Sequence, residues 1–378
     1  MTFKLSLRGD RVVWIIVFLL TVFGLLGVYS STGALAYRFR DGNVEAYLFK
    51  HAALLALGYI GAYFVHKVDY RFWARVATPL LATALLLLVF TLTQGEEYQI
   101  NRANRWVSLW GMSFQPSDLA KFALTVFLAK ALAKRQERIK DFRKGFIPVF
   151  LVVLAVCGLI APANLSTAAL VFVSSTGLMY VAGVRFKYLA GLVGAGIAGT
   201  TFLILTVPRA ATWKQRLHDY FMRIFDSAYE PHYQIVQSNV ALVNGGFFGM
   251  GPGHSVQRNF LPHPYSDFIY SILVEEYGFL GGIIILSLFL WLMFRTLAVA
   301  VRAKTFGALL AFGLALTIVS QALINIGVTA GLLPVTGLPL PLVSMGGTSI
   351  VFTSVSVGVI LSVARSLQSE GRDSSDDR

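Results

Sequence analysis

Runs of about 20 mostly apolar residues recur along this chain and are separated by short polar or charged segments. A helix of that length crosses a hydrocarbon layer of roughly 30 Å and satisfies its backbone hydrogen bonds internally. Only 13% of the 378 residues are charged, against roughly 25% in soluble domains. We therefore predict an all-α polytopic membrane protein with about ten transmembrane helices. The spans are expected at residues 12–31, 47–66, 74–93, 114–133, 145–161, 165–184, 188–207, 268–294, 305–329 and 343–364.

The distribution of basic residues predicts the orientation of these helices. With ten spans, both termini lie on the same side of the membrane, and that side carries roughly twice as many Lys and Arg residues as the other. The positive-inside rule then places the N- and C-termini in the cytoplasm. The same asymmetry accounts for most of the net charge of +13, so we expect no nucleic-acid partner.

The long segment at residues 208–267, before the eighth span, is predicted to lie on the extracytoplasmic side. It is rich in aromatic residues, which favour the membrane interface, and we expect amphipathic interfacial helices there. Residues 1–365 are interpreted as a single transmembrane domain. The polar stretch at residues 366–378 is interpreted as a disordered cytoplasmic tail.

Carboxylates beside and within the eighth span, Asp267, Glu275 and Glu276, are the first candidates for chemistry, because ionisable groups there are costly and usually mark a site. On one helix, Asp267 and Glu275 would lie roughly 12 Å apart along the axis. That is too far for the carboxylate pair, about 5 Å apart, of retaining sugar chemistry. One carboxylate acting alone as a base, with a metal ion or a basic clamp, fits better. The alternative for Asp267 is a helix-terminal residue that complements the helix dipole.

A charged pair, Asp118 and Lys121, lies within the fourth span, just after Pro116, which suits a helix start. At this spacing the two side chains share a helix face and can pair. The pair either only neutralises buried charge or lines an anion-binding cavity. The glycine-rich run at residues 245–253 is interpreted either as a tight turn or as a loop near a lipid diphosphate. The histidines of the outer segment match no standard metal pattern.

The chain contains the stretches ANRW, FQPSDLAK, YQIVQS, GGFFGMGPGHSVQ, LPHPYSDFI, EEYG and GLLPVTGLPLPLVSMGGTS. Together they resemble the signatures of the SEDS family (shape, elongation, division and sporulation), and the resemblance extends from about residue 12 to residue 365. The block at residues 331–349 is the most specific. The short stretch GMGPGHSVQ is more similar to the FtsW branch of the family than to the RodA branch.

The resemblance implies a peptidoglycan glycosyltransferase that polymerises lipid II at the outer face of the bacterial cytoplasmic membrane during septal synthesis. It implies a cognate class B penicillin-binding protein transpeptidase and other divisome membrane proteins as partners. Asp267 takes the position of the family's catalytic acid and is also a candidate ligand for a divalent metal ion, Mg²⁺ or Mn²⁺. The residues assigned to substrate binding are Arg105, Gln115, Ser117, Asp118, Lys121, Arg216, Gln234, Ser238 and Glu275.

Several positions depart from the family's pattern, and the roles of the replaced side chains stay open. The replacements are Asp118 for Glu, Asn164 for Asp, His263 for Glu, Tyr265 for His, Ser266 for Thr and Met345 for Tyr.

Three other functions remain open: a lipid II flippase, an elongation polymerase of the RodA type, and a noncatalytic scaffold for cell-wall enzymes. A bundle with buried charges is also what a transporter looks like. A flippase needs polar groups along its full path, whereas here most polar groups cluster toward the outer half. This placement favours the polymerase.

The charge pattern makes a topological prediction. A reporter that is active only outside the cytoplasm should be inactive when fused near Arg138, in the basic loop at residues 134–144, and active within residues 208–266. Reporter activity in cells carrying each fusion measures this. An active fusion at Arg138 would overturn the predicted orientation.

Overall fold

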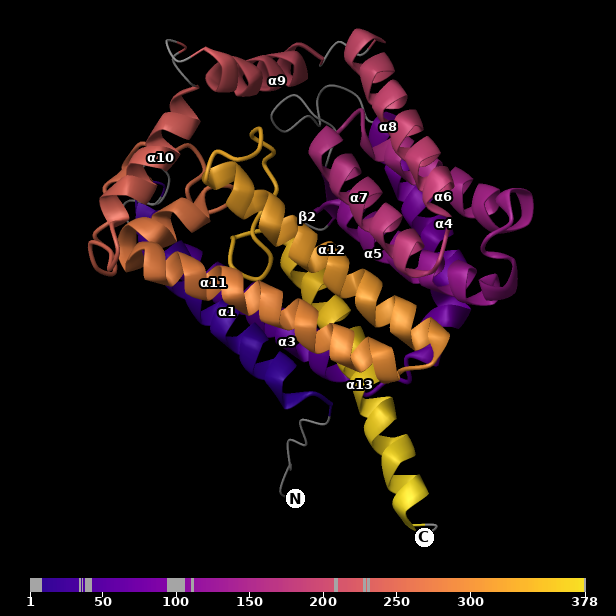
Figure 1. The fold of residues 1–378 in the computed structure, drawn as a ribbon. Helices are drawn as coiled ribbons and strands as arrows, with labels where there is room; N and C mark the ends of the chain where they lie inside the picture. Colours follow the sequence, from indigo (N-terminus) through magenta and orange to yellow (C-terminus); the bar gives the residue numbers. More distant parts are fainter. Residues whose placement is uncertain are drawn as a thin grey trace.

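The structure is a computed structural model that describes residues 9–33, 35, 37, 43–93, 106–109, 112–206, 210–226, 229 and 232–376. Helices dominate and pack as a bundle, and α9 (Ala210–Phe225) crosses one end of it (Figure 1). At the other end the beginning of the described chain meets its last helix. The N–H and the carbonyl of Gly9 hydrogen-bond with the side-chain amide of Gln368 at 3.3 and 3.0 Å. The side of the membrane on which these termini lie stays a prediction.

A helix is present at each of the ten predicted spans. These helices are α1 (Arg11–Ser31), α3 (Val44–Val65), α4 (Arg71–Thr93), α5 (Pro116–Lys134), α6 (Ile147–Ile160), α7 (Leu165–Val181), α8 (Phe186–Thr206), α11 (Ile269–Arg302), α12 (Thr305–Thr329) and α13 (Thr348–Asp376). Eight helices of the described residues are long and apolar enough to cross a membrane, when α6 is counted together with the π-helical turn Phe142–Phe146 that leads into it. The other two are α7, with 17 residues, and α5, which carries Asp118 and Lys121. The exact number of spans therefore stays a prediction.

Shorter elements connect these helices. The segment at residues 208–267 contains two helices, α9 and α10 (Tyr233–Gly245). Their position at the outer membrane interface stays a prediction. The remaining elements are the antiparallel strands β1 (Val107–Leu109) and β2 (Met112–Phe114), the 3-10 helices η2 (Gln136–Arg138) and η4 (Gln257–Asn259), and the π-helix η3 (Phe142–Phe146).

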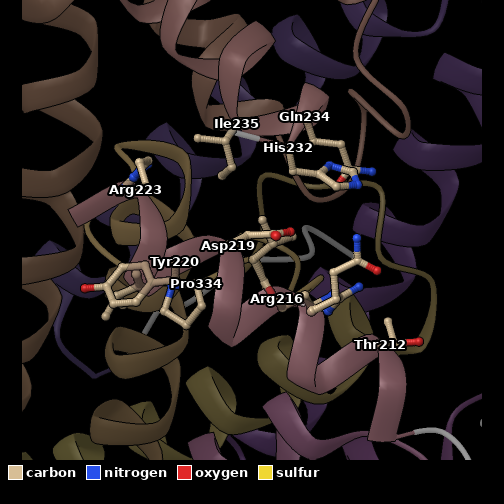
Figure 2. A pocket seen from close by; sticks show the side chains of 12 residues that line it. Thr212, Arg216, Asp219, Tyr220, Arg223, His232, Gln234, Ile235 and Pro334 are labelled. Carbon is tan, nitrogen blue, oxygen red and sulfur yellow. Dashed lines mark hydrogen bonds between the residues drawn. The ribbon is translucent and has the colours of Figure 1, made fainter. Parts of the chain in front are cut away.

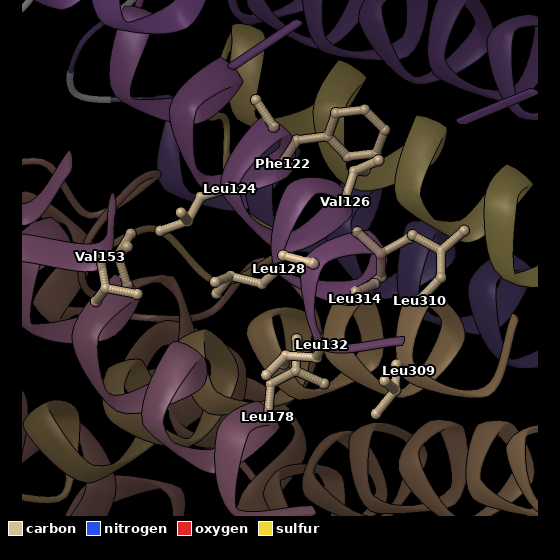
Figure 3. Packing of buried hydrophobic residues seen from close by; sticks show 14 of the residues in the cluster. Phe122, Leu124, Val126, Leu128, Leu132, Val153, Leu178, Leu309, Leu310 and Leu314 are labelled. Carbon is tan, nitrogen blue, oxygen red and sulfur yellow. The ribbon is translucent and has the colours of Figure 1, made fainter. Parts of the chain in front are cut away.

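The helix α12 is the central element of the bundle, because it packs against α5, α7, α11 and α13. Figure 3 shows the larger apolar cluster, in which leucines of α5, α7 and α12 pack together with Val153 of α6. Small residues permit this close approach. A Cβ on Gly313 of α12 would lie 2.9 Å from the side chains of both Leu178 and Thr125. A second apolar cluster joins α1, α11 and α13.

The helix α11 is broken at Gly278, which has a φ of 71°. Glycine adopts this left-handed φ without the steric penalty that other residues meet. The span predicted at residues 268–294 contains this break, which divides the 34-residue helix into a short segment before Gly278 and a long apolar segment after it.

The glycine-rich run at residues 245–253 folds against this break. The N–H groups of Met250 and Gly251 donate to the carbonyls of Glu275 and Glu276 at 2.9 and 3.0 Å. The run therefore satisfies backbone carbonyls that the interrupted helix leaves open. Of the two interpretations of this run, the structure supports the tight turn.

The structure differs from the sequence-based expectation at the end of the chain. A disordered tail was expected from residue 366, whereas α13 continues to Asp376. Serine hydroxyls bond to carbonyls of the same helix here, and Gln368 reaches Gly9. The helix extension therefore has partners that its polar composition did not indicate.

Replacing Gly278 by alanine should lower the stability of the fold by about 2 kcal/mol. The new Cβ would lie 2.3 Å from the carbonyl oxygen of Phe247, at a strained positive φ. Thermal unfolding in detergent measures the effect. The control is Gly194→Ala on α8, where a Cβ meets nothing within 4 Å. Equal melting temperatures for Gly278→Ala and wild type would contradict this account of the break.

Candidate functional site

A cavity of about 390 Å³ lies where α5 and α7 begin, beside the segment that precedes α11. Four of the predicted site residues line it, Gln115, Asp118, Lys121 and Asp267. The other lining residues are Trp106, Ser113, Asn164, Thr167, His263, Tyr265, Ser266, Gly337, Leu338, Pro339, Met345, Gly346, Gly347 and Ser349. The fold thus brings the charged pair of the fourth span and the carboxylate before the eighth span to one cavity.

Asp267 precedes α11, whose N-cap residue is Phe268 and whose first residue is Ile269. Asp267 is therefore not the cap of this helix. Its Oδ1 accepts a hydrogen bond from Ser266 Oγ at 2.9 Å. Its Oδ2 lies 3.4 Å from the position that a Cβ on Gly337 would take. This half-buried carboxylate lines the cavity, which favours a chemical role over a capping role.

Tertiary hydrogen bonds hold the backbone around Asp267. The three consecutive carbonyls at residues 265–267 each accept a hydrogen bond from a different donor. These donors are the N–H of Met345 at 3.0 Å, Ser344 Oγ at 2.6 Å and Asn325 Nδ2 at 2.9 Å. The position of Asp267 therefore depends on α12 and on the segment that follows it.

The predicted ion pair is present and lines the same cavity. Lys121 Nζ lies 2.9 Å from Asp118 Oδ1 and donates to Gln321 Oε1 at 2.9 Å. Thr348 Oγ1 donates to Asp118 Oδ2, also at 2.9 Å. Asp118 is 3% exposed, so the pair neutralises two charges in a largely buried place. Because both residues also line the cavity, the neutralising and the anion-binding interpretations are compatible.

Two helices begin at this cavity. The helix α5 starts at Pro116 as predicted, with Gln115 as its N-cap residue. The helix α7 starts after Asn164, whose Oδ1 accepts a hydrogen bond from the N–H of Thr167 at 3.2 Å. Helix N-termini carry a partial positive charge. The cavity wall formed by α5 and α7 therefore combines Lys121 with two helix N-termini.

Sequence reasoning missed part of this wall. Asn164 was noted only as a departure from the family's pattern, although an Asn directly before an apolar run is an N-cap signal. Residues 337–347 were recognised as a family signature but not as a lining of the site. No local pattern indicates that this segment faces Asp267.

A second cavity of about 180 Å³ lies beneath α9 and contains two more predicted residues, Arg216 and Gln234 (Figure 2). Arg216 Nη1 donates to the carbonyl of Val335 at 3.1 Å. Burial lowers the pKa of the Arg216 guanidinium, and the negative charge of Asp267 acts in the opposite direction. Arginine nevertheless stays charged, so Arg216 contributes positive charge behind the segment that separates the two cavities.

One face of α9 holds this separating segment. Arg216, Tyr220 and Arg223 follow each other at helical spacing, and each donates to a backbone carbonyl within residues 331–335. The distance from Tyr220 Oη to the carbonyl of Leu332 is 3.0 Å. The helix α9 is thus attached to the segment at residues 331–335. Gly337, two residues further along the chain, lies next to Asp267.

Ser117 and Ser238 lie outside the two cavities. Ser117 Oγ accepts a hydrogen bond from Gln115 Nε2 at 2.9 Å. Ser238 Oγ lies 2.6 Å from Ser271 Oγ and donates to the carbonyl of Thr329 at 2.9 Å. These bonds give Ser238 a role in joining α10 to α11 and α12.

Glu275 also lies outside the cavities and is fully buried. Its carboxylate accepts hydrogen bonds from Asn244 Nδ2 and from the N–H of Gln257, both at 3.2 Å, and from the hydroxyl of Ser255. It therefore holds the loop after α10 against α11. The remaining predicted residue, Arg105, lies outside the described residues.

Among the described residues, no group of three or more His, Cys, Asp or Glu side chains could hold a metal ion. Asp118, the other carboxylate of the main cavity, is already bonded to Lys121 and Thr348. Mg²⁺ commonly takes one or two protein carboxylates together with substrate phosphates and water. The cavity therefore suits a divalent ion only together with a phosphate-bearing substrate, with Asp267 as the protein ligand.

Comparison with known proteins identifies close sequence relatives. A family model described as "Cell cycle protein", for FtsW, RodA and SpoVE, matches residues 10–369. The "Probable peptidoglycan glycosyltransferase FtsW" of Trichlorobacter lovleyi is 36% identical over 363 residues, which cover 95% of this chain and 94% of the relative. Stage V sporulation protein E of Bacillus subtilis is also 36% identical, over 361 residues that cover 94% and 97%.

Solved structures share the fold over nearly the whole chain. A chain from a peptidoglycan synthase complex that coordinates polymerization and crosslinking has a TM-score of 0.75 and 27% identity, covering 96% of this chain and 99% of that one. The rod shape determining protein RodA of Thermus thermophilus has a TM-score of 0.68 and 26% identity, covering 96% and 98%.

The ion pair makes a prediction about stability. Lys121→Met alone should destabilise the protein by about 3 kcal/mol, because it leaves the buried Asp118 carboxylate without its counter-ion. The double variant Asp118→Leu/Lys121→Met should recover most of this loss, since buried pairs are often replaceable by apolar residues. Melting temperatures in detergent compare the variants. A double variant no more stable than the single one would contradict this account of the pair.

Proposed function

The chain belongs to the FtsW, RodA and SpoVE family of cell cycle proteins, and on that premise we propose that it is a peptidoglycan glycosyltransferase that polymerises lipid II. One observation carries the proposal. The carboxylate of Asp267 shares a cavity with a wall formed by the beginnings of α5 and α7, where Asp118 pairs with Lys121. This arrangement separates a proton acceptor from an anion-stabilising surface.

The reaction needs both of these parts. The donor is a sugar whose anomeric carbon is bonded to a polyprenyl diphosphate, and the acceptor is a sugar hydroxyl on a second lipid-linked molecule. The new bond from the acceptor oxygen to the anomeric carbon forms as the bond to the diphosphate breaks. The hydroxyl proton passes to a base, and the electron pair of the broken bond leaves with the diphosphate. Asp267 is the proposed base.

The leaving diphosphate gains negative charge, and the α5–α7 wall is suited to stabilise it. Lys121 has three N–H donors, and among the described residues Asp118 and Gln321 take two of them. The third is left for a phosphate oxygen. The N-termini of α5 and α7 add oriented N–H dipoles on the same side of the cavity.

The polyprenyl chain has an apolar surface beside the same helix end. A groove of about 430 Å³ lies between α6, α7 and α8 and is lined by apolar and small residues. Leu165 and Ala168 of α7 face this groove, whereas Asn164 and Thr167 face the cavity. A lipid could therefore place its diphosphate at the start of α7 and its tail along the other side of that helix.

As an alternative to its role as the base, Asp267 is proposed as the protein ligand of a divalent ion, Mg²⁺ or Mn²⁺. When bound, such an ion would supply further positive charge to the diphosphate. Asp267 and Lys121 would then set the two ends of the substrate.

The biological role is proposed to be septal cell-wall synthesis at the outer face of the cytoplasmic membrane. The relatives named FtsW are 36% identical to this chain, whereas the RodA structure is 26% identical, which favours division over elongation. The proposed partners are a class B penicillin-binding protein transpeptidase and other divisome membrane proteins. The likeness to a chain of a peptidoglycan synthase complex supports a transpeptidase partner.

A lipid II flippase is less well supported by the shape of the interior. Below Lys121 the polar lining continues to Thr317 and Ser356, but the space there is about 30 Å³. Such a volume holds a water molecule or two, and it is too small for a sugar headgroup. The polar cavity therefore ends within the bundle in this conformation.

Asp267→Asn should reduce lipid II polymerisation by about 10² to 10⁴-fold while thermal stability and lipid II binding persist, because the amide cannot accept the proton. Polymerisation by purified protein in detergent measures this and scores no transbilayer transport. The matched control is Asp69→Asn, since Asp69 caps a backbone N–H at 2.8 Å before α4 and Asn also caps well. Near-wild-type turnover by Asp267→Asn would sink the assignment.

A further inference from the structure

Side chains from outside α11 hold the backbone of Asp267. It lies before the first residue of α11, so the hydrogen bonds of that helix do not fix it. Its backbone carbonyl instead accepts a hydrogen bond from Asn325 Nδ2 at 2.9 Å. Asn325 is 1% exposed and comes from the central helix α12. The backbone carbonyl of the proposed base is therefore held by a buried amide of another helix.

Asn325 joins two segments of the cavity wall. The same Nδ2 atom donates to the carbonyl of Leu338 at 2.7 Å. Both acceptors are carbonyl oxygens, so the nitrogen of the amide must face them, and the orientation of the side chain is determined. Its Oδ1 is buried and has no hydrogen-bond partner among the residues that the structure describes. An apolar side chain would avoid this uncompensated acceptor, so packing alone does not explain an amide here.

Gln321 repeats this arrangement one helical turn earlier, on the same face of α12. Its Nε2 donates to the carbonyl of Pro339 at 2.8 Å, and its Oε1 accepts from Lys121 Nζ at 2.9 Å. The amides of Gln321 and Asn325 thus form a continuous connection. It runs from Lys121 through Pro339 and its neighbour in the chain to the backbone of Asp267.

We propose that Asn325, supported by Gln321 and by Ser344, is a positioning residue that sets the placement of Asp267 relative to Lys121. The proposal rests on the proposed function, because it assigns these residues to the same cavity. Amides suit this role because they donate to carbonyls without adding a charge near the base. Misplacement of a reacting group by about 1 Å can cost roughly 10²-fold in rate, so the connection matters more for turnover than for substrate binding.

The test uses two variants of Asn325 in the full-length purified protein, with lipid II as the substrate. Asn325→Leu removes both donated hydrogen bonds. It should lower kcat by about 10 to 100-fold while KM changes by about twofold or less. Asn325→Asp also replaces the donating amide by a carboxylate that accepts, so it should lower kcat at least as far.

A matched control separates positioning from a general effect on α12. Thr329 is fully buried one turn further along this helix, and within the described part of the chain its hydroxyl donates only to carbonyls of α12, at 3.1 and 2.8 Å. Thr329→Val should keep the kcat and KM of the wild type. Comparable losses in Thr329→Val and Asn325→Leu would overturn the proposal.

Other outcomes are equally decisive. Wild-type kcat in Asn325→Leu or in Asn325→Asp would overturn the positioning role. If both variants fail to fold, Ser344→Ala carries the test, because it removes only the hydroxyl that donates to the carbonyl of Ser266 at 2.6 Å and accepts from the N–H of Leu340 at 2.8 Å. An unchanged kcat in that variant would likewise overturn the proposal. Inactive wild-type protein would instead count against the proposed function.

Discussion

Backbone carbonyls that no helix satisfies are the constraint on which the candidate site depends. The segment at residues 331–347 joins α12 to α13 without forming a helix, yet Leu338, Leu340 and Val343 within it are buried. Where water is excluded, such carbonyls need donors from the protein. The amides of α12 supply donors to one part of the segment, and the arginine and tyrosine side chains of α9 supply donors to another. Because one of these amides also holds Asp267, the groups that satisfy this backbone also determine the geometry of the cavity.

The placement of charges follows from a similar requirement, because a buried charge needs a partner just as a buried carbonyl needs a donor. Lys121 lies in an apolar bundle and needs a counter-ion, which Asp118 supplies one turn earlier on α5. The pair is neutral as a unit, so the local excess of positive potential comes from the two helix N-termini beside it. Asp267 lines the same cavity from the segment that precedes α11. In a displacement that moves negative charge from an attacking hydroxyl to a leaving diphosphate, charge would move away from Asp267 and toward α5 and α7. The arrangement of the walls thus favours one direction of charge transfer.

The sequence predicted most of the helices because a bilayer imposes a fixed apolar length, and that length is visible in a single chain. It also predicted the start of α5 at Pro116 and the pairing of Asp118 with Lys121, since both are local. It did not predict the structural role of Glu275, whose partners come from loops that only the tertiary fold brings near. The break in α11 was hidden for the same reason, because a glycine inside an apolar run is common in membrane helices and becomes a break only where another segment binds the exposed carbonyls.

Several residues that depart from the family's pattern make hydrogen bonds or ion pairs at the cavity. Ser266 keeps a hydroxyl that donates to Asp267 Oδ1 at 2.9 Å, and the shorter carboxylate of Asp118 still reaches Lys121. Asn164 caps α7 as an aspartate would, but it leaves the helix N-terminus without a compensating negative charge. Burial raises the pKa of Tyr265, and the charge of Asp267 raises it further, so this residue stays a neutral hydrogen-bond donor at physiological pH. Ser266 thus hydrogen-bonds the proposed base, Asp118 pairs with Lys121, and the neutral Asn164 adds no negative charge at the start of α7, on the proposed diphosphate side.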